Sequence, residues 1–251
     1  MYMENKKLLS LVIPAYNEEG NLKNTIKIFH NHLKENDIPH EILVINDHSS
    51  DNTESILKEL ILDINELRYI NSNYSRGFGS TVTKGLRNFS GDYVAIVMAD
   101  LSDDPEDLVR FYHEMEKGYD CIFGSRFIKG GRTKDYPRHK FILNRIVNSM
   151  IKWFFWINYN DTTNAFKMYR RDTIKGLEPI LSKHFNLTVE LPLKAIVRGY
   201  SYSVLPNSWK NRTAGTSNLK IKEMGSRYSF IILYCLIERW LSRGDYKKNE
   251  H

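Results

Sequence analysis

Acidic side chains gather at residues 99–105, directly after the strongly apolar run 93–98. Asp100, together with Asp103 or Asp104, offers carboxylate oxygens, which are the ligands that hard divalent cations such as Mg²⁺ and Mn²⁺ prefer. The competing interpretation is a helix N-terminus, where the acids at Asp103 and Asp104 would interact favourably with the helix dipole.

Basic side chains form a second group later in the chain. They are Arg126, Lys140, Arg145, Arg212 and Lys220. Arginine holds a phosphate through two parallel hydrogen bonds, whereas lysine acts as a point charge. The group therefore indicates phosphate binding, with a solvated surface charge as the alternative for each member.

Candidate nucleotide contacts lie near the start of the chain. Asp47 follows the apolar run 41–45, and its carboxylate can accept hydrogen bonds from the N–H groups of a base. The alternative is a capping aspartate, a role for which Asp51 is better placed. Glu18 is a second candidate, for ribose or base edges, and its alternative is a solvated turn residue. The Gly-x-Gly at 77–79 is equally compatible with backbone approach to a phosphate and with a plain loop.

The elements that position these residues alternate along the chain. Apolar runs predicted as buried strands lie at residues 8–13, 41–45, 67–71, 93–98 and 121–124. The segments between them are predicted as helices, which implies a mostly parallel, doubly wound α/β sheet with helices on both faces. Ligands of such sheets bind beyond the carboxyl ends of the strands, where these candidates lie.

The remainder of the chain is less regular. It is predicted to hold a basic loop at 129–140, an aromatic helix at 141–159, a helix at 186–198, a strand at 202–205, a basic loop at 211–222 and an apolar helix at 223–241.

Composition narrows the class of protein. The 251 residues carry 36 basic and 30 acidic side chains, a net charge of +6. This balance does not indicate nucleic-acid binding, but it suits a protein that faces phosphates or anionic lipid. Cys121 and Cys235 lack metal or redox spacing, so two buried thiols in a reducing compartment are expected. We expect no signal peptide and no membrane span, since no apolar run reaches roughly 18 residues.

Six segments, in order along nearly the whole chain, resemble the motifs of family 2 glycosyltransferases, in particular the dolichyl-phosphate (polyprenyl-phosphate) mannosyl- and glucosyltransferases. They are VIPAYNE at 12–18, INDHSSDNT at 45–53, ADLSDDP at 99–105, FGSRF at 123–127, DTTNAFKMYRR at 161–171 and WKNRTAGTSNLK at 209–220. Any one of these motifs alone would be unspecific, whereas their common order is not.

The resemblance implies a GT-A fold and an inverting transfer of mannose or glucose from a nucleotide-diphosphate sugar to a polyprenyl or dolichyl phosphate. It implies a catalytic domain at 1–222, with a nucleotide-binding half at about 1–128 and an acceptor-binding half at about 129–222. A C-terminal apolar helix and basic tail follow at 223–251.

Site residues are carried over from the motifs as expectations. The donor sugar nucleotide, GDP-mannose or UDP-glucose, is expected at Pro14, Tyr16, Glu18, Ile45, Asp47, Gly77, Gly79, Ala99, Asp100, Ser102, Arg212 and Lys220. The acceptor phosphate is expected at Arg126, Lys140 and Arg145. Catalytic roles fall to Asp100, Asp103 and Arg126, and the divalent cation, Mg²⁺ or Mn²⁺, to Asp100, Ser102 and Asp103.

Two positions depart from the family pattern. Met98 replaces the first acid of the usual Asp-x-Asp motif, so metal binding rests on Asp100 with a neighbouring acid and the ligand's own phosphates, or is dispensable. Asn218 stands where relatives often carry lysine, and Lys220 is the candidate to supply that charge.

The aromatic segments at 151–156 and 230–240 fit a protein that lies on a membrane, although core packing or a dimer interface would use the same residues. Many relatives carry membrane-spanning helices after the catalytic domain, and none is expected here. We therefore expect a peripheral protein at the cytoplasmic face of the membrane, with a membrane-protein partner as a further option.

Three alternatives stay open. The acceptor is a hydroxyl group on a glycan or small molecule, for which Asp103 or Asp104 would be the base. Alternatively, Met98 marks a degenerate, non-catalytic scaffold. A nucleotidyltransferase shares the fold class, but it would open with a glycine-rich basic loop, and residues 14–18 are not of that kind.

Overall fold

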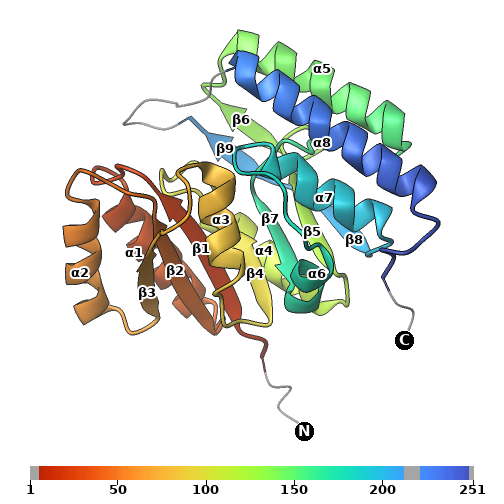
Figure 1. Cartoon of the computed structure of the whole chain (residues 1–251). Coiled ribbons are helices and arrows are strands. Elements are labelled where there is room, and N and C mark those ends of the chain that lie inside the picture. The colour runs from red at the N-terminus through yellow and green to blue at the C-terminus, as the bar shows by residue number, and fades with distance from the viewer. Residues whose placement is uncertain (1–5, 212–220, 249–251) are drawn as a thin grey trace, which may run out of the picture.

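The computed structural model describes residues 6–211 and 221–248, and a seven-stranded sheet forms its centre (Figure 1). The strand order is β3-β2-β1-β4-β7-β5-β8. The strands are β1 (Leu9–Ala15), β2 (His40–Asn46), β3 (Leu67–Asn71), β4 (Tyr93–Ile96), β5 (Cys121–Ser125), β7 (Lys167–Arg170) and β8 (Tyr202–Pro206). Of these strands, β7 alone runs antiparallel to its neighbours, β4 and β5. The predicted mostly parallel α/β sheet is confirmed.

Helices cover both faces of this sheet. They are α1 (Leu22–Glu35), α2 (Thr53–Asp63), α3 (Phe78–Leu86), α4 (Pro105–Glu116), α5 (Arg138–Phe155), α6 (Arg171–Gly176), α7 (Leu187–Val197) and α8 (Ile221–Leu241). Successive residues of β1 point to opposite faces, so Leu11 and Ile13 pack with α1, α2 and α4, whereas Val12 packs with α3. Because both faces are buried, the strand is apolar throughout rather than alternating.

Two long helices form an outer layer beyond α7. α8 contacts both α7 and α5, and Figure 1 shows α5 and α8 side by side. Cys121 and Cys235 are both buried and unbridged, as expected. Among the described residues, no helix has the length and apolar character that a membrane crossing requires.

One prediction for the second half was wrong. The segment 129–140 was expected as a loop, but it contains strand β6 (Arg132–Lys134), and α5 already begins at Arg138. β6 pairs in parallel with β9 (Ser208–Lys210) in a small separate sheet. All of β6 is exposed, so its sequence carries none of the apolar signal that marks the central strands.

Candidate active site

The loops that follow β1 and β2 are joined by hydrogen bonds at the carboxyl edge of the sheet. The Asn17 backbone N–H donates to Ser49 Oγ at 3.0 Å, and the Ser50 N–H donates to Asn17 Oδ1 at 2.8 Å. The Glu18 N–H donates to Thr53 Oγ1 at 2.9 Å. These contacts make the two loops one unit, so candidate residues from both motifs occupy a common edge.

Asp47 connects this unit to the loop after β3. Its own N–H donates to the carbonyl oxygen of Ala15 at 2.8 Å, and its Oδ2 accepts the Gly77 N–H at 3.1 Å. Oδ1 lies 3.1 Å from His48 Nδ1. The side chain is buried, yet a carboxylate has acceptor sites beyond these contacts, and a nucleobase N–H could use them.

The glycines at 77 and 79 allow two backbone segments to approach each other closely. A Cβ on Gly79 would lie 2.3 Å from the carbonyl oxygen of Ser182, and Gly77 has a φ of 150°, which disfavours other residues. The first turn of α3 therefore packs directly against residues 182–184. In the same loop, the Arg76 guanidinium carbon stacks 3.6 Å from the centre of the Tyr16 ring.

The hydrophobic members of the predicted donor site lie at the strand ends. Pro14 and Ile45 are direct partners in the β1–β2 register. Ala99 is buried, and its carbonyl oxygen accepts a hydrogen bond from Thr25 Oγ1 at 2.7 Å, which fixes the segment after β4 to α1. These residues shape the edge rather than supply polar groups.

The acidic segment after β4 turns back on itself. The Ser102 N–H donates to Asp100 Oδ1 at 3.1 Å, and the Met98 N–H donates to Asp103 Oδ2 at 3.0 Å. Asp104 accepts the Glu106 N–H at 3.0 Å and caps α4. The helix-start interpretation therefore holds for Asp104, while Asp103 is directed inward.

Asp103 lies close enough to Asp100 and Arg126 for their charges to act on it. Burial raises the pKa of the Asp103 carboxyl to about 7, and the negative charge of Asp100 adds to that increase. The Met98 N–H and the positive charge of Arg126 oppose it. The structure thus brings all three predicted catalytic residues together.

A divalent cation would find few protein ligands here. Within residues 6–211 and 221–248, no group of three or more His, Cys, Asp or Glu side chains is arranged to hold a metal ion. The Asp100 carboxylate and the nearby Ser102 hydroxyl are hard oxygen donors, which fit Mg²⁺ or Mn²⁺. Such an ion would need the phosphate oxygens of a bound ligand to complete its shell.

Arg126 enters the site in a buried ion pair that sequence reasoning did not identify. Its Nε and Nη2 donate to the two carboxylate oxygens of Asp161, each at 2.8 Å, and its backbone N–H donates to Asp161 Oδ2 at 3.0 Å. Asp161 begins the motif at 161–171, but no sequence signal relates it to Arg126, which lies 35 positions earlier.

Arg145 comes to the same place from α5. Its Nη1 donates to the carbonyl oxygen of Asn160 at 3.0 Å, and its guanidinium carbon lies 4.6 Å from the centre of the Phe127 ring. The Arg126 guanidinium lies 5.4 Å from that same ring. Lys140 is half-exposed on α5, and Arg212 and Lys220 lie outside the described residues.

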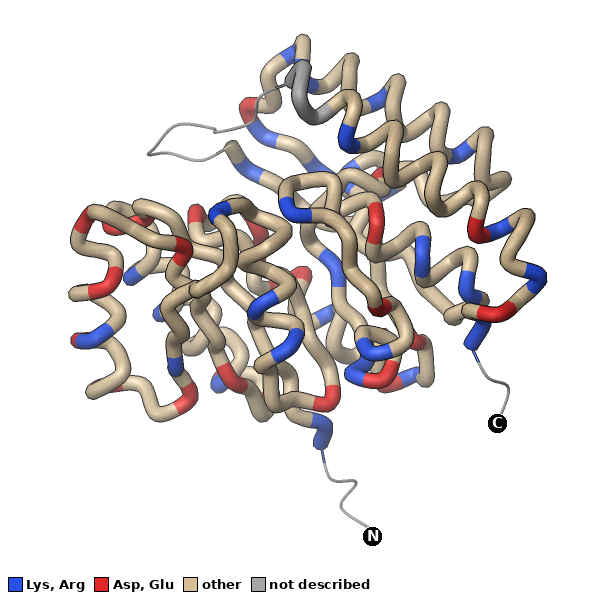
Figure 2. Tube along the Cα trace, viewed as in Figure 1, with Lys and Arg blue, Asp and Glu red and all other residues tan. Residues whose placement is uncertain are grey.

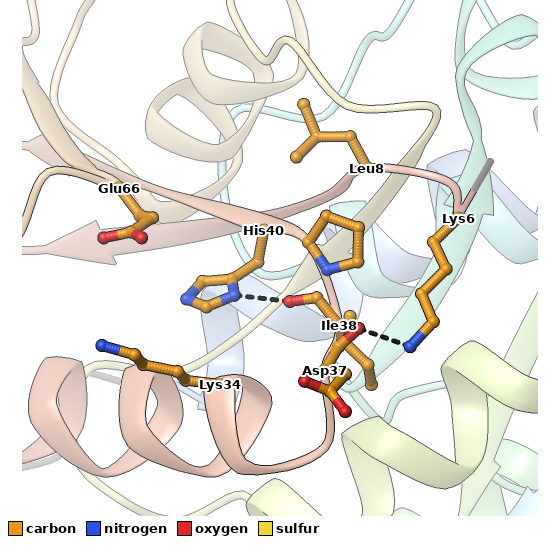
Figure 3. Close-up of a pocket in the computed structure, with 8 residues that line it drawn as sticks. Lys6, Leu8, Lys34, Asp37, Ile38, His40 and Glu66 are labelled. Atoms are coloured by element: carbon orange, nitrogen blue, oxygen red, sulfur yellow. Dashed lines mark hydrogen bonds between the residues drawn. The ribbon is translucent and has the colours of Figure 1, made fainter.

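A separate hollow lies at the opposite end of the sheet. Figure 3 shows this pocket of about 450 Å³, lined by Lys34, His40 and Glu66 among others. His40 is the first residue of β2 and Glu66 directly precedes β3, so the pocket lies at the amino ends of these strands. None of the predicted site residues lines it.

Comparisons with known proteins identify the family of this chain. The model of the family "Glycosyl transferase family 2" matches residues 10–177. The chain is 28% identical over 218 residues to a polyprenol monophosphomannose synthase of Mycolicibacterium smegmatis, covering 83% of this chain and 80% of that protein. It is 29% identical over 224 residues to a dolichol-phosphate mannosyltransferase of Pyrococcus furiosus, covering 85% of this chain but only 60% of the relative.

A solved structure shares the fold. Glucosyl-3-phosphoglycerate synthase from Mycobacterium tuberculosis, crystallised with Mn²⁺, UDP-glucose and phosphoglyceric acid, superposes with a TM-score of 0.68 at 15% sequence identity. The match covers 93% of this chain and 79% of that one. The likeness confirms the GT-A type of α/β fold, and with the family match and the motif order it leads to one conclusion: the chain belongs to glycosyl transferase family 2.

Proposed function

We propose that this protein transfers a hexose, mannose or glucose, from a nucleoside-diphosphate sugar to a polyprenyl phosphate, with inversion at the anomeric carbon. The observation that carries the proposal is the placement of Arg126 and Arg145 around Phe127, beside the acidic segment of a family 2 transferase. Two guanidinium groups beside a leaving-group site suit an anionic acceptor. The names of the two mannosyltransferase relatives support the same acceptor.

The donor would bind across the loops after β1 to β4. Asp47 would accept a base N–H, with Pro14, Tyr16, Glu18 and the 77–79 loop around the nucleoside. GDP-mannose and UDP-glucose both present an N–H group that a carboxylate can accept. Mg²⁺ or Mn²⁺, held by Asp100 with Ser102 and the donor's phosphates, would supply charge neutralisation for the diphosphate. The Mn²⁺ complex of the solved structure supports this assignment.

The transfer itself does not require a strong general base from the protein. An oxygen of the acceptor phosphate, already anionic near neutral pH, attacks the anomeric carbon from the face opposite the diphosphate. A new carbon–oxygen bond forms as the bond to the diphosphate breaks, and the nucleoside diphosphate departs with the electron pair. Arg126 and Arg145 hold the attacking phosphate in line, so the catalytic contribution is positioning and charge stabilisation.

A second acceptor class has its own support. The solved relative was crystallised with phosphoglyceric acid, a small molecule that carries a hydroxyl group as well as a phosphate. With such an acceptor the arginines would bind the phosphate, and a carboxylate would have to take the hydroxyl proton. Asp103 is the candidate for this role, because Asp104 is engaged in capping α4.

We further propose that the protein lies at the cytoplasmic face of the membrane, which it would contact through α5 and α8. Their exposed apolar side chains include Ile142, Ile146, Met150, Trp153, Phe230, Leu233, Ile237 and Trp240. α5 contains four Arg or Lys residues and no acid in its sequence, and Figure 2 shows basic positions along both helices. Apolar and aromatic side chains next to cations are complementary to an anionic lipid surface.

Calorimetric titration with GDP-mannose and UDP-glucose, each with and without Mn²⁺, tests the donor site. We expect tight, Mn²⁺-enhanced binding of one donor, weakened at least tenfold in Asp100→Ala and unchanged in the exposed control Asp172→Ala. A folded wild-type protein that binds neither donor would instead support the scaffold alternative.

Transfer of labelled hexose to farnesyl phosphate or to 3-phosphoglycerate then identifies the acceptor. Product from farnesyl phosphate alone supports the lipid-phosphate assignment. Product from 3-phosphoglycerate alone would replace it with the hydroxyl alternative.

A further inference from the structure

We propose that Asp161 and Asn160 are positioning residues, which hold the guanidinium groups of Arg126 and Arg145 in a preformed receptor for the acceptor's phosphate. This inference rests on the proposed function, because it concerns the same acceptor site. It adds two residues that do not themselves contact the reacting atoms and assigns each of them an arginine to orient.

Asp161 holds Arg126 at both its backbone and its guanidinium group. The carboxylate accepts the backbone N–H, Nε and Nη2 of Arg126, and both side chains are buried. The pair therefore sets the guanidinium plane, and the N–H groups that Asp161 does not bind face the neighbouring Tyr136 or a ligand. The Asp161 carboxylate also offsets the positive charge of Arg126, whereas Arg145 has no such carboxylate among its described contacts.

Asn160 performs the equivalent task for Arg145 and for the ring between the two. Its carbonyl oxygen accepts Arg145 Nη1, and its side-chain Nδ2 donates to the carbonyl oxygen of Phe127 at 3.0 Å. Its Oδ1 accepts Ser125 Oγ at 2.6 Å. Residues 160 and 161 thus join the end of β5 to α5, and each orients one arginine.

The loop that carries these residues is itself held in place by a buried lysine on β7. Lys167, fully buried on β7, donates to the carbonyl oxygens of Thr162 and Asn164, and at 3.2 Å to that of Thr188 in the first turn of α7. The loop 160–164 is therefore held at both ends before any ligand arrives. A receptor whose side chains are already ordered loses less free energy to side-chain ordering when the ligand binds.

Asp161→Asn tests the proposal in the full-length protein. Asparagine offers one acceptor and an NH₂ group where Arg126 presents only donors, so the guanidinium must rotate away. In steady-state transfer to farnesyl phosphate, from whichever of GDP-mannose and UDP-glucose binds, we expect KM for farnesyl phosphate to rise at least tenfold. The donor Kd should stay within twofold, and Asp172→Asn should change neither quantity.

A double variant separates positioning from general structural support. If Asp161 acts through Arg126, adding Asp161→Asn to Arg126→Gln should raise the KM for farnesyl phosphate no further. Asn160→Ala serves if Asp161→Asn does not fold. Alanine keeps the carbonyl oxygen that accepts Arg145 but removes the side-chain bonds to Phe127 and Ser125 that hold this carbonyl in place, so the same KM should rise several-fold. Additive effects in the double variant, or a loss of donor affinity in either single variant, would overturn the proposal.

Binding of inorganic phosphate distinguishes this inference from the proposed reaction. In protein labelled with ¹⁵N-arginine, the Nε–H signals of Arg126 and Arg145, assigned through Arg126→Lys and Arg145→Lys, should shift on phosphate addition. The phosphate Kd should weaken at least tenfold in Asp161→Asn. If phosphate binds in this way but farnesyl phosphate is not glycosylated, the proposed acceptor is wrong and the receptor stands. If neither arginine responds to phosphate, the positioning roles are refuted.

Discussion

At the scale of single residues, the proposed phosphate site combines one arginine that is paired with a carboxylate and one that is not. Among the described residues, Asp161 accepts three donors from Arg126, whereas Arg145 contacts a carbonyl oxygen and the face of the Phe127 ring. A buried guanidinium without a carboxylate would be costly in the empty site. The arrangement thus lets the protein bury Arg126, while the half-buried Arg145 would supply the charge that attracts a phosphate in the proposed site.

Lys167 gives this cluster a pH dependence whose direction can be stated. Burial lowers the pKa of Lys167 from its ordinary value to about 7, against an opposing effect of Asp161. Between pH 7 and about 10, the unfolded chain therefore holds a proton that the folded chain releases. Folding stability from this group should rise with pH across that window, since the cost of burying the charge disappears.

Urea unfolding at pH 7, 8, 9 and 10 checks this expectation against Lys167→Met. The free energy of unfolding of wild type minus that of the variant should increase with pH by up to a few kcal/mol, at about 1.4 kcal/mol for each pKa unit. Lys175→Met, an exposed lysine, should run parallel to wild type. A difference that narrows with pH would show that the three carbonyl acceptors stabilise the ammonium by more than burial destabilises it.

At the scale of elements, α8 is attached to the domain through a buried ion pair with Arg198, the residue that follows α7. Arg198 Nε and Nη2 donate to the Glu238 carboxylate at 2.7 and 3.0 Å, and both side chains are buried. Arg198 Nη1 also donates to the carbonyl oxygens of Gly176 and Glu178. Glu238, which interrupts the apolar pattern of the last helix, therefore ties this helix to the end of α7.

Glu238→Ala should loosen α8 because it leaves a buried guanidinium without its carboxylate. Loss of one partner of such a pair costs about 3–5 kcal/mol. Thermal unfolding should show a large decrease in Tm, and hydrogen exchange should show α8 losing protection before the central strands do. Asp172→Ala, which breaks the exposed pair with Lys175, should change the Tm by little. Equal effects of the two variants would refute this role for Glu238.

At the scale of the whole molecule, local sequence predicted most elements of both halves, including α7, β8 and α8, but not the long-range pairs that join them. The strands around Val12 and Ile45 and the proline start of α4 follow from local patterns of burial and capping. β7 enters the sheet between β4 and β5 in the opposite direction, and local sequence carries no information on partner order. For the same reason the partnership of Asp161 with Arg126 required the structure.

The same distinction applies to the surface of α5 and α8. Helical spacing identified their apolar residues but could not say which of them pack inward. In the structure Ile151, Phe155 and Ile231 are buried, whereas Trp153 and Trp240 remain 70% and 67% exposed. An exposed apolar area that continues across two neighbouring helices is unusual on a protein without a partner for it. The basic residues on the same two helices make an anionic bilayer the occupant that we predict.

Sedimentation with vesicles tests this surface. Wild-type protein should sediment with phosphatidylcholine vesicles that contain 30% phosphatidylserine, and less with phosphatidylcholine alone or in high salt, since the basic residues contribute through a screened charge interaction. Trp153→Ala combined with Trp240→Ala should weaken binding at least tenfold, because two large apolar side chains no longer enter the interface.

Ile61→Ala combined with Leu62→Ala removes exposed apolar side chains from α2 and should leave binding unchanged. The tryptophan variant should still glycosylate farnesyl phosphate in solution, because neither tryptophan belongs to the proposed phosphate receptor. If that variant instead binds vesicles normally and wild-type protein is a dimer that the substitutions dissociate, the surface covers a second copy of the chain rather than lipid.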